Sequence, residues 1–195
     1  MNKFLHVGCG PNRKNNLKGF EDWDEIRLDI DPKVEPDIIG SLTDMTACES
    51  GFFDALYSSH NIEHIYPHEV PIAINEFLRV INSDGFVVIT CPDLQSVGAQ
   101  LASGRLIEPL YDSDAGQISA IDIIYGHRGS IANGNLYMQH KSGFTFPVLS
   151  TLFREAGFAH TFGGSIPELY AIWMIAFKGS PTQKEVESMA FKFLP

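Results

Sequence analysis

Two short stretches near the start of the chain carry residue types that suit the binding of a nucleoside. Gly8 and Gly10 follow the apolar residues Phe4–Val7, and a second apolar run ends in Asp29 about twenty residues later, a spacing at which a carboxylate can reach ribose hydroxyls. Glycine has no Cβ, so its backbone accepts a positive φ and lets a ligand come close. In an open α/β sheet, ligands bind beyond the carboxyl ends of the strands. These residues therefore predict a nucleoside site at the ends of two strands.

The glycine pair does not complete a dinucleotide fingerprint. Arg13 stands where the third glycine would fall. That glycine allows a helix to pack closely on a strand beside a pyrophosphate. Its absence favours a nucleoside ligand without a pyrophosphate, and a nicotinamide-dependent enzyme is the weaker alternative. Taken alone, the two glycines are also compatible with an ordinary turn between a strand and a loop.

The segment His60–His64 matches the order H-x-x-E-H of the inverted zinc-protease motif. That motif needs a continuous helix, so that both histidines project from one face. Here the segment directly follows a predicted strand, and Pro67 disfavours helical geometry in Tyr66. No third ligand follows at helical spacing. We therefore expect no metal site, and interpret Glu63 and His64 as residues that cap and pack the next helix.

Apolar runs and amphipathic stretches predict a mostly parallel α/β sheet with helices around it. The expected strands are Phe4–Val7, Ile26–Ile30, Asp37–Gly40, Phe52–Ser58, Phe86–Thr90, Phe158–Phe162 and Leu169–Lys178. The expected helices are Pro67–Ile81, Gln95–Ala102, Ser113 or Asp114 to Tyr125, Thr145–Ala156 and Gln183–Leu194. Gly85 is expected to end the first helix in a left-handed turn. The last two strands are joined without a helix, by a Gly-Gly-Ser-Ile-Pro connection, and should be antiparallel.

One long stretch interrupts this alternation. Leu94–Phe144 contains two predicted helices followed by glycines and polar residues. A segment of this length between sheet elements is typical of a lid or a binding loop. We therefore expect a single domain over residues 1–195, with a lid that forms the acceptor site at about 94–144. The polar and basic segment Pro11–Trp23 should contain a short helix or none.

Composition limits the classes of partner and compartment. The chain has 195 residues, 44% of them hydrophobic, and a net charge of −10, which predicts a globular fold and disfavours binding to nucleic acid. Three scattered cysteines suggest a reducing compartment rather than a disulfide framework. The first strand begins almost at the N-terminus and no apolar run could span a bilayer. We expect a cytoplasmic protein that does not contact a membrane; the oligomeric state is left open.

At this point the sequence resembles the class I S-adenosylmethionine (SAM)-dependent methyltransferases, and within them the small-molecule group called type 11. The matching pieces, in the family's order, are LHVGCGP, RLDIDP, IIGSLTDM, FDALYSSHNIEH, NEFLRVINSDGFVVITCPD and GFTFPVLSTLFREAGF. The resemblance implies a Rossmann-like fold in three αβα layers. Its seven-stranded sheet would have the order 3-2-1-4-5-7-6, parallel except for the seventh strand.

The resemblance also implies the residues that bind SAM. Gly8, Gly10 and the backbone of Cys9 would approach the methionine moiety and the ribose. Asp29 would hold the ribose hydroxyls, with Asp31 as the second candidate.

Three further positions carry implied roles in binding SAM. The Leu42 backbone and the Asp44 carboxylate would contact the adenine edge, although the family often has an aspartate where Ser41 stands. Asp44 could instead start a turn through its own side chain. Ser59 and His60 would face the sulfonium.

Methyl transfer from a sulfonium requires proximity and, for an oxygen or nitrogen acceptor, sometimes a general base. Histidine suits that task because its pKa lies near neutral, and His60 or His127 is the candidate base. Tyr125–Lys141 would cover a small-molecule acceptor, and Arg128 could bind its carboxylate or phosphate; the alternative is that these are surface loop residues. A methyltransferase-like protein that binds the nucleoside but regulates or scaffolds remains the other hypothesis.

Overall fold

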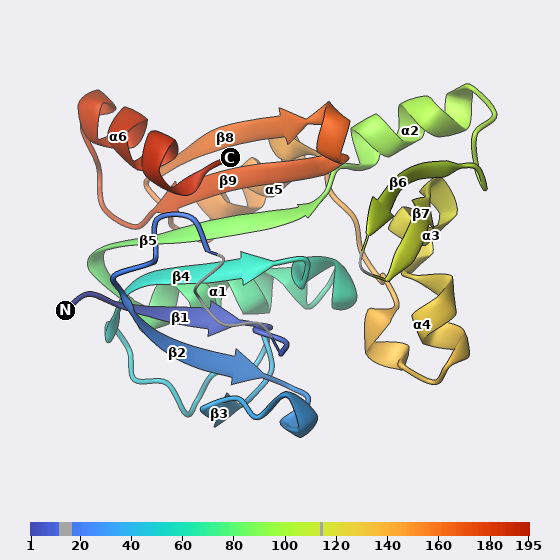
Figure 1. Cartoon of the computed structure of the whole chain (residues 1–195). Helices are drawn as coiled ribbons and strands as arrows, with labels where there is room; N and C mark the ends of the chain where they lie inside the picture. The colour runs from blue at the N-terminus through green and yellow to red at the C-terminus, as the bar shows by residue number, and fades with distance from the viewer. Residues whose placement is uncertain (12–16, 114) are drawn as a thin grey trace.

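The computed structural model describes residues 1–11, 17–113 and 115–195. Its main sheet has seven strands in the order β3-β2-β1-β4-β5-β9-β8 (Figure 1). These strands are β1 Lys3–Val7, β2 Asp24–Asp29, β3 Ile38–Ile39, β4 Phe53–Ser59, β5 Ile81–Pro92, β8 His160–Ile166 and β9 Ala171–Phe177. β1 to β5 pair in parallel, and β9 runs antiparallel between β5 and β8. The predicted sheet and its antiparallel strand are confirmed.

Helices and an aromatic cluster cover the two faces of the sheet. On one face, α1 (Val70–Val80) and α5 (Phe146–Glu155) contribute Ile74, Phe77 and Phe153 to the larger apolar core. On the other face, Phe20 and Phe193 pack with strand residues, and Phe193 belongs to the terminal helix α6 (Gln183–Phe193). Strands buried on both faces read as continuous apolar runs, which is why the sequence pattern was informative.

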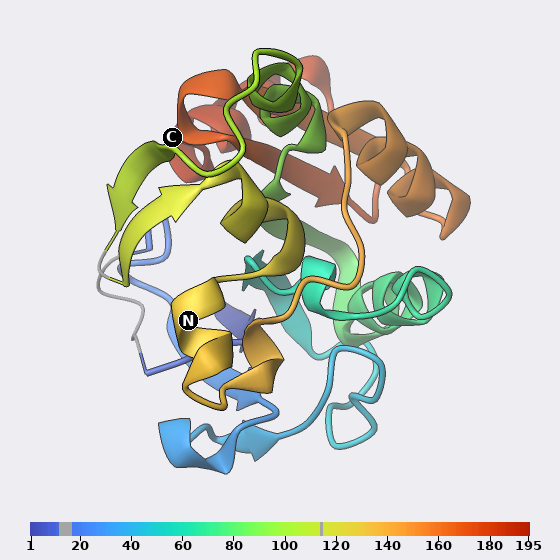
Figure 2. The same cartoon turned by 90° about the vertical axis from the view of Figure 1, so that its right-hand side faces the viewer.

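The segment that follows β5 folds beyond the carboxyl ends of the parallel strands. It contains α2 (Leu94–Ala102), a hairpin of β6 (Pro109–Ser113) and β7 (Gly116–Ser119), α3 (Ala120–Tyr125) and α4 (Arg128–Ala132). Figure 1 shows these elements beyond the arrowheads of β1, β2 and β4, and Figure 2 looks onto that end of the sheet. A small apolar core of its own, including Val97, Ile118 and Ile123, holds the segment together.

The second helix expected in this segment was wrong over most of its length. Helix α3 begins only at Ala120, because Ser119 and Asp122 form a capping box there, and residues before it form the hairpin. Gly116 has a φ of +113°, which closes the hairpin and which other residues rarely adopt. Asp114, one of the two proposed helix starts, lies outside the described residues, as do Arg13 and Lys14.

Three other boundaries also differ from expectation. The left-handed turn predicted at Gly85 was wrong: β5 continues through this residue, where a Cβ would lie 2.9 Å from the Cβ of Ile81. Helix α1 begins at Val70 rather than at the proline predicted, because Tyr66 and Glu69 first form a turn. The Gly-Gly pair expected to connect the last two strands belongs to β8. Among the described residues, no helix combines the length and apolarity needed to cross a membrane.

Candidate functional site

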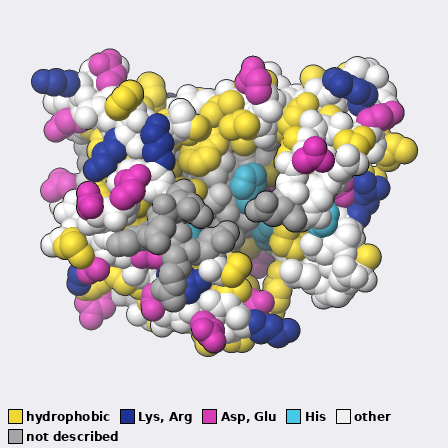
Figure 3. All heavy atoms as spheres, viewed as in Figure 1, with side chains coloured by type: hydrophobic (Ala, Val, Ile, Leu, Met, Phe, Trp, Pro, Cys, Tyr) yellow, Lys and Arg dark blue, Asp and Glu magenta, His cyan; other side chains and the backbone are white. Residues whose placement is uncertain are grey.

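A cavity of about 730 Å³ lies between the carboxyl ends of the parallel strands and the segment that follows β5. Its wall includes the glycine turn after β1, the ends of β2 and β4, and residues from the hairpin and from the stretch after α4. Figure 3 shows histidine side chains in the hollow between these two parts of the molecule, beside hydrophobic side chains. The volume lies within the range of small-molecule and cofactor sites.

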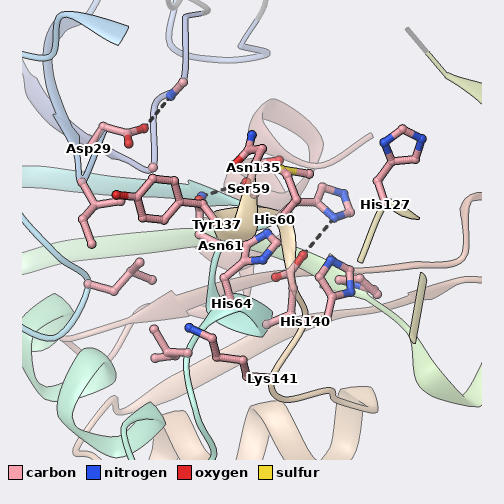
Figure 4. Close-up of a pocket in the computed structure, with 18 of the residues that line it drawn as sticks. Asp29, Ser59, His60, Asn61, His64, His127, Asn135, Tyr137, His140 and Lys141 are labelled. Carbon is pink, nitrogen blue, oxygen red and sulfur yellow. Dashed lines mark hydrogen bonds and ion pairs between the residues drawn. The ribbon is translucent and has the colours of Figure 1, made fainter. Parts of the chain in front are cut away.

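The glycine turn and Asp29 are joined directly. The Gly10 N–H donates a hydrogen bond of 2.8 Å to Oδ2 of Asp29, and the Asp31 N–H donates one of 2.9 Å to Oδ1 (Figure 4). Gly8, Gly10 and Asp29 all line the cavity. Cys9 points into the core, and burial raises the pKa of its thiol to about 11, so the thiol stays protonated. Its backbone is the part that could meet a ligand.

Gly8 packs against the side chain of Asn61, which the sequence does not predict to be part of the site. Its φ is +63°, and a Cβ placed there would lie 1.9 Å from Oδ1 of Asn61. Asn61 is fixed, because its Nδ2 donates to the backbone oxygens of Val7 and Ser59 at 3.0 and 2.8 Å. The amide thus links the ends of β1 and β4. The H-x-x-E-H motif points to His60, Glu63 and His64 as functional residues, whereas no sequence pattern points to Asn61.

We expect Gly8→Ala to lower the free energy of unfolding by about 2–3 kcal/mol, because a left-handed non-glycine residue costs about 1–2 kcal/mol and the Cβ must also displace Asn61. Gly10→Ala is the matched control: its φ is +53°, yet a Cβ there meets no atom of the described residues within 4 Å. Chemical denaturation measures both variants. Equal losses for the two would contradict the role of Asn61, whereas Asn61→Ala should partly restore the stability of Gly8→Ala.

Of the two residues predicted to contact the adenine, one lines the cavity and the other does not. Leu42 lines the cavity together with Ser41 and Thr43. Asp44 is exposed and is not among the residues that line the cavity. Its Oδ1 instead accepts hydrogen bonds from the backbone N–H and the hydroxyl of Thr46, which lower the pKa of the carboxyl. This is the turn-forming arrangement that was the alternative for Asp44.

Arg27 supports the cofactor end of the cavity from behind. Its side chain is buried, and its guanidinium donates to the backbone oxygens of Gly10, Val34 and Glu35. The guanidinium of Arg27 therefore connects the glycine turn to the loop after β2 through hydrogen bonds. No sequence signal separated this arginine from an ordinary strand residue, because its partners are backbone atoms.

The end of β4 presents Ser59 and His60 to the cavity. His60 has a φ of +52°, and its N–H donates to the Thr90 oxygen at 2.9 Å. Its ring Nδ1 lies 3.3 Å from Oε1 of Glu63, whose side chain is 1% exposed. Desolvation lowers the pKa of His60, but the contact with the Glu63 carboxylate and its charge outweigh this effect and raise that pKa. Burial alone would raise the pKa of Glu63, yet the surrounding histidines hold it below its usual value.

Two further histidines approach Glu63. His64 follows it in a 3-10 helix over Ile62–His64, and His140 comes from the stretch after α4. One ligand atom from each of Glu63, His64 and His140 lies within 4.8 Å of the others. Figure 4 shows His60, His64 and His140 gathered in one part of the cavity. The expectation that Glu63 and His64 cap the next helix was wrong, since α1 begins at Val70 and they face the cavity instead.

The other predicted residues of the acceptor side have structural partners. The Arg128 guanidinium binds both carboxylate oxygens of Asp122, at 2.7 and 3.0 Å, and holds the pKa of that carboxyl well below its usual range despite desolvation. Its fork is therefore engaged rather than free for an acceptor anion. His127 lines the cavity, but its Nδ1 accepts the Ser130 N–H at 3.2 Å and caps α4. In Figure 4 it lies apart from His60.

Comparison with known proteins gives a match to one family model over part of the chain. Residues 5–89 match a family model described as a methyltransferase domain. No curated protein matches the sequence. Many solved structures share the fold, and all those compared below have low sequence identity.

Three solved structures illustrate the shared fold. A SAM-dependent methyltransferase from Archaeoglobus fulgidus is 15% identical with a TM-score of 0.57, over 91% of this chain and 86% of its own. One from Thermotoga maritima is 13% identical with a TM-score of 0.56, over 91% and 82%. The third, from Burkholderia thailandensis, is a 1,6-didemethyltoxoflavin-N1-methyltransferase with bound S-adenosylhomocysteine. It is 13% identical with a TM-score of 0.56, over 91% and 71%.

The strand order of the sheet agrees with this match. Its antiparallel β9 inserted between β5 and β8 gives the arrangement expected for class I methyltransferases, once the extra hairpin is left out of the numbering. Residues 5–89 thus carry a methyltransferase domain, which is the domain of an enzyme family and implies SAM as the cofactor.

Proposed function

We propose that this protein transfers the methyl group of SAM to an oxygen or nitrogen atom of a small molecule bound under the segment 94–144. The observation that carries the proposal is that one cavity is lined by Gly8, Gly10, Asp29 and His60. This arrangement supports the proposal, because the glycine turn and His60 line the same cavity. SAM supplies a methyl group on a positively charged sulfur.

The residues around the glycine turn fit the cofactor. The left-handed Gly8 and Gly10 leave the backbone open toward the cavity. Asp29 already orders this turn through one hydrogen bond, and carboxylate oxygens can accept further bonds from ribose hydroxyls. Leu42 supplies an apolar wall for the adenine. We assign that contact to Leu42 and Thr43 rather than to Asp44, which lies off the cavity wall.

The acceptor side of the cavity is aromatic and partly basic. Tyr66, Tyr111, Tyr137 and Tyr170 line it together with Lys141, whose ammonium lies 5.0 Å from the ring centre of Tyr66. These side chains suit a flat or ring-shaped acceptor with a polar edge, because aromatic faces stack on rings. The segment 94–144 would act as the lid that excludes water from this space.

The geometry favours His60 over His127 as the base. Glu63 lies at Nδ1 of His60, so the proton of the neutral ring sits on Nδ1 and the lone pair on Nε2 is free. His127 has the opposite arrangement, because its Nδ1 accepts a backbone N–H and the proton must sit on Nε2. We therefore propose that His60 removes the acceptor's proton and that His127 holds α4.

Two measurements test this function. Calorimetry with S-adenosylhomocysteine should show binding of one equivalent to the full chain. A screen of metabolite and sugar pools with SAM should then reveal an acceptor through release of S-adenosylhomocysteine. Failure to bind the nucleoside would overturn the proposal. Binding without turnover across broad pools would support the regulatory or scaffold alternative.

A further inference from the structure

The buried carboxylate of Glu63 lacks the partners that such a group normally has. Its side chain is 1% exposed, and neither oxygen accepts a hydrogen bond of ordinary geometry from the described residues. Its ion-pair partner there is His60, at 3.3 Å from Oε1. A buried ionised group costs several kcal/mol unless it is paired or coordinates a metal. A cation beside this carboxylate would therefore stabilise the site.

His64 and His140 lie beside this carboxylate, and in each ring one nitrogen is bound to a backbone oxygen. Nδ1 of His64 lies 3.0 Å from the backbone oxygen of Gln139, and Nδ1 of His140 lies 2.7 Å from that of Ile123. Because a carbonyl oxygen can only accept, both rings must carry a proton on Nδ1. In the neutral form, the Nε2 atom of each ring then has a free lone pair.

The result is a convergence of three electron-pair donors. A carboxylate oxygen and two imidazole nitrogens lie within 4.8 Å of one another, and neither carboxylate oxygen of Glu63 has a hydrogen-bond partner among the described residues. Histidines that ligate metals commonly donate their other ring N–H to a backbone carbonyl, which fixes the tautomer and the ring orientation. His64 and His140 both show that arrangement.

We propose that Glu63, His64 and His140 bind a divalent transition-metal ion, with zinc as the candidate whose usual ligand set they match. Two histidines and one carboxylate form the ligand set of catalytic zinc sites, in which the fourth position stays open. Ligands of one tetrahedral zinc lie about 3.4 Å apart, given zinc–nitrogen bonds of about 2.1 Å. The three atoms would have to approach one another by at most about 1.4 Å, which side-chain rotations allow.

The fold supplies the third ligand that the H-x-x-E-H motif lacked. His140 comes from the segment 94–144, far from the motif in sequence, and the motif itself lies in a 3-10 turn rather than in a continuous helix. This arrangement differs from a protease site and replaces the expectation of no metal. It also connects the lid to the end of β4, because the backbone N–H groups of Lys141 and Ser142 donate hydrogen bonds to the backbone oxygen of Glu63.

The open position would face the acceptor side of the cavity. Resting on the proposed function, we infer that it takes an oxygen atom of the acceptor, since a divalent ion lowers the pKa of a bound hydroxyl. The O–H bond would break with its electron pair left on oxygen, and the proton would pass to Nε2 of His60. Glu63 would then serve both groups, with Oε1 toward His60 and Oε2 toward the ion.

Zinc titration of the full chain tests the site directly. Protein that has been treated with a chelator, and then freed of it, should bind one equivalent of Zn²⁺ by calorimetry. His140→Ala and Glu63→Gln should each weaken zinc binding more than the 10- to 100-fold typical for loss of an outer-shell partner. His68→Ala is the matched control, because this exposed histidine lies outside the cluster and should leave zinc affinity unchanged.

A second measurement needs no variant. One equivalent of Co²⁺ should give the visible absorption of a low-coordinate nitrogen and oxygen site, and Zn²⁺ should remove it. Absence of stoichiometric zinc and cobalt binding by the natural protein, or full zinc affinity in His140→Ala, would overturn the proposal. Affinity for S-adenosylhomocysteine, measured in parallel, reports separately on the proposed function, because the glycine turn and Asp29 do not touch these ligands.

Discussion

Asp29→Ala is expected to weaken the binding of S-adenosylhomocysteine by at least about a hundredfold. A hydrogen bond to a charged group contributes about 1.5–3 kcal/mol, and each 1.4 kcal/mol is a factor of ten in affinity. The carboxylate would hold two ribose hydroxyls, and it also fixes the Gly10 N–H at 2.8 Å. The variant therefore loses the ligand contacts and the order of the glycine turn together. Calorimetry with the purified chain measures the effect.

Asp31→Ala is the matched control for this prediction. Asp31 also lines the cavity and was the second candidate for the ribose, but its Oδ1 accepts the Lys33 N–H and starts a 3-10 turn. We expect the control to change affinity by less than about threefold, as is usual for a substitution outside the contact. If Asp31→Ala loses affinity and Asp29→Ala does not, the ribose is bound by Asp31 and the role proposed for Asp29 is wrong.

The parallel part of the sheet was predictable because its strands are buried on both faces. Runs such as Phe86–Thr90 contain almost no polar residue, and short loops left few alternatives for their order. The hairpin in the lid was not predictable in the same way. Ile118, Ile121 and Ile124 recur at helical spacing, although Ile118 belongs to β7 and Ile121 and Ile124 to α3. A period that spans a strand and a helix cannot be recognised from spacing alone.

The residues of the candidate site also differ in whether the local sequence or contacts far along the chain determine their positions. Gly8, Gly10 and Asp29 could be found because each ends a strand, and strand ends meet at one edge of a parallel sheet. Asn61 and His140 could not, because their partners lie far along the chain. The bond from Asn61 to Val7 spans 54 positions, and that from His64 to Gln139 spans 75. The Asn61 bond exists only once β1 and β4 have paired, and the His64 bond only after the lid has folded onto the sheet.

His60→Ala is expected to lower kcat by about 10²- to 10⁴-fold, the usual contribution of a positioned general base. Glu63 lies at Nδ1 of His60, which leaves Nε2 as the nitrogen that would accept the proton, and His60 lines the cavity. His127→Ala should change kcat by less than about threefold. Nδ1 of His127 already accepts the Ser130 N–H and is therefore not available to accept a proton from the acceptor. The measurement is kcat with the acceptor that the screen identifies, alongside affinity for S-adenosylhomocysteine.

The backbone at His60 requires a second variant. Its φ of +52° is unfavourable for alanine but is adopted more readily by asparagine. His60→Asn therefore removes the imidazole while keeping the local conformation, and it should lose kcat as severely as His60→Ala. Full turnover in His60→Asn would mean that the left-handed backbone, and not the ring, is what the reaction needs. Full turnover in both His60 variants would exclude this histidine as the base. A loss of kcat with unchanged nucleoside affinity would assign the defect to the proton-transfer step.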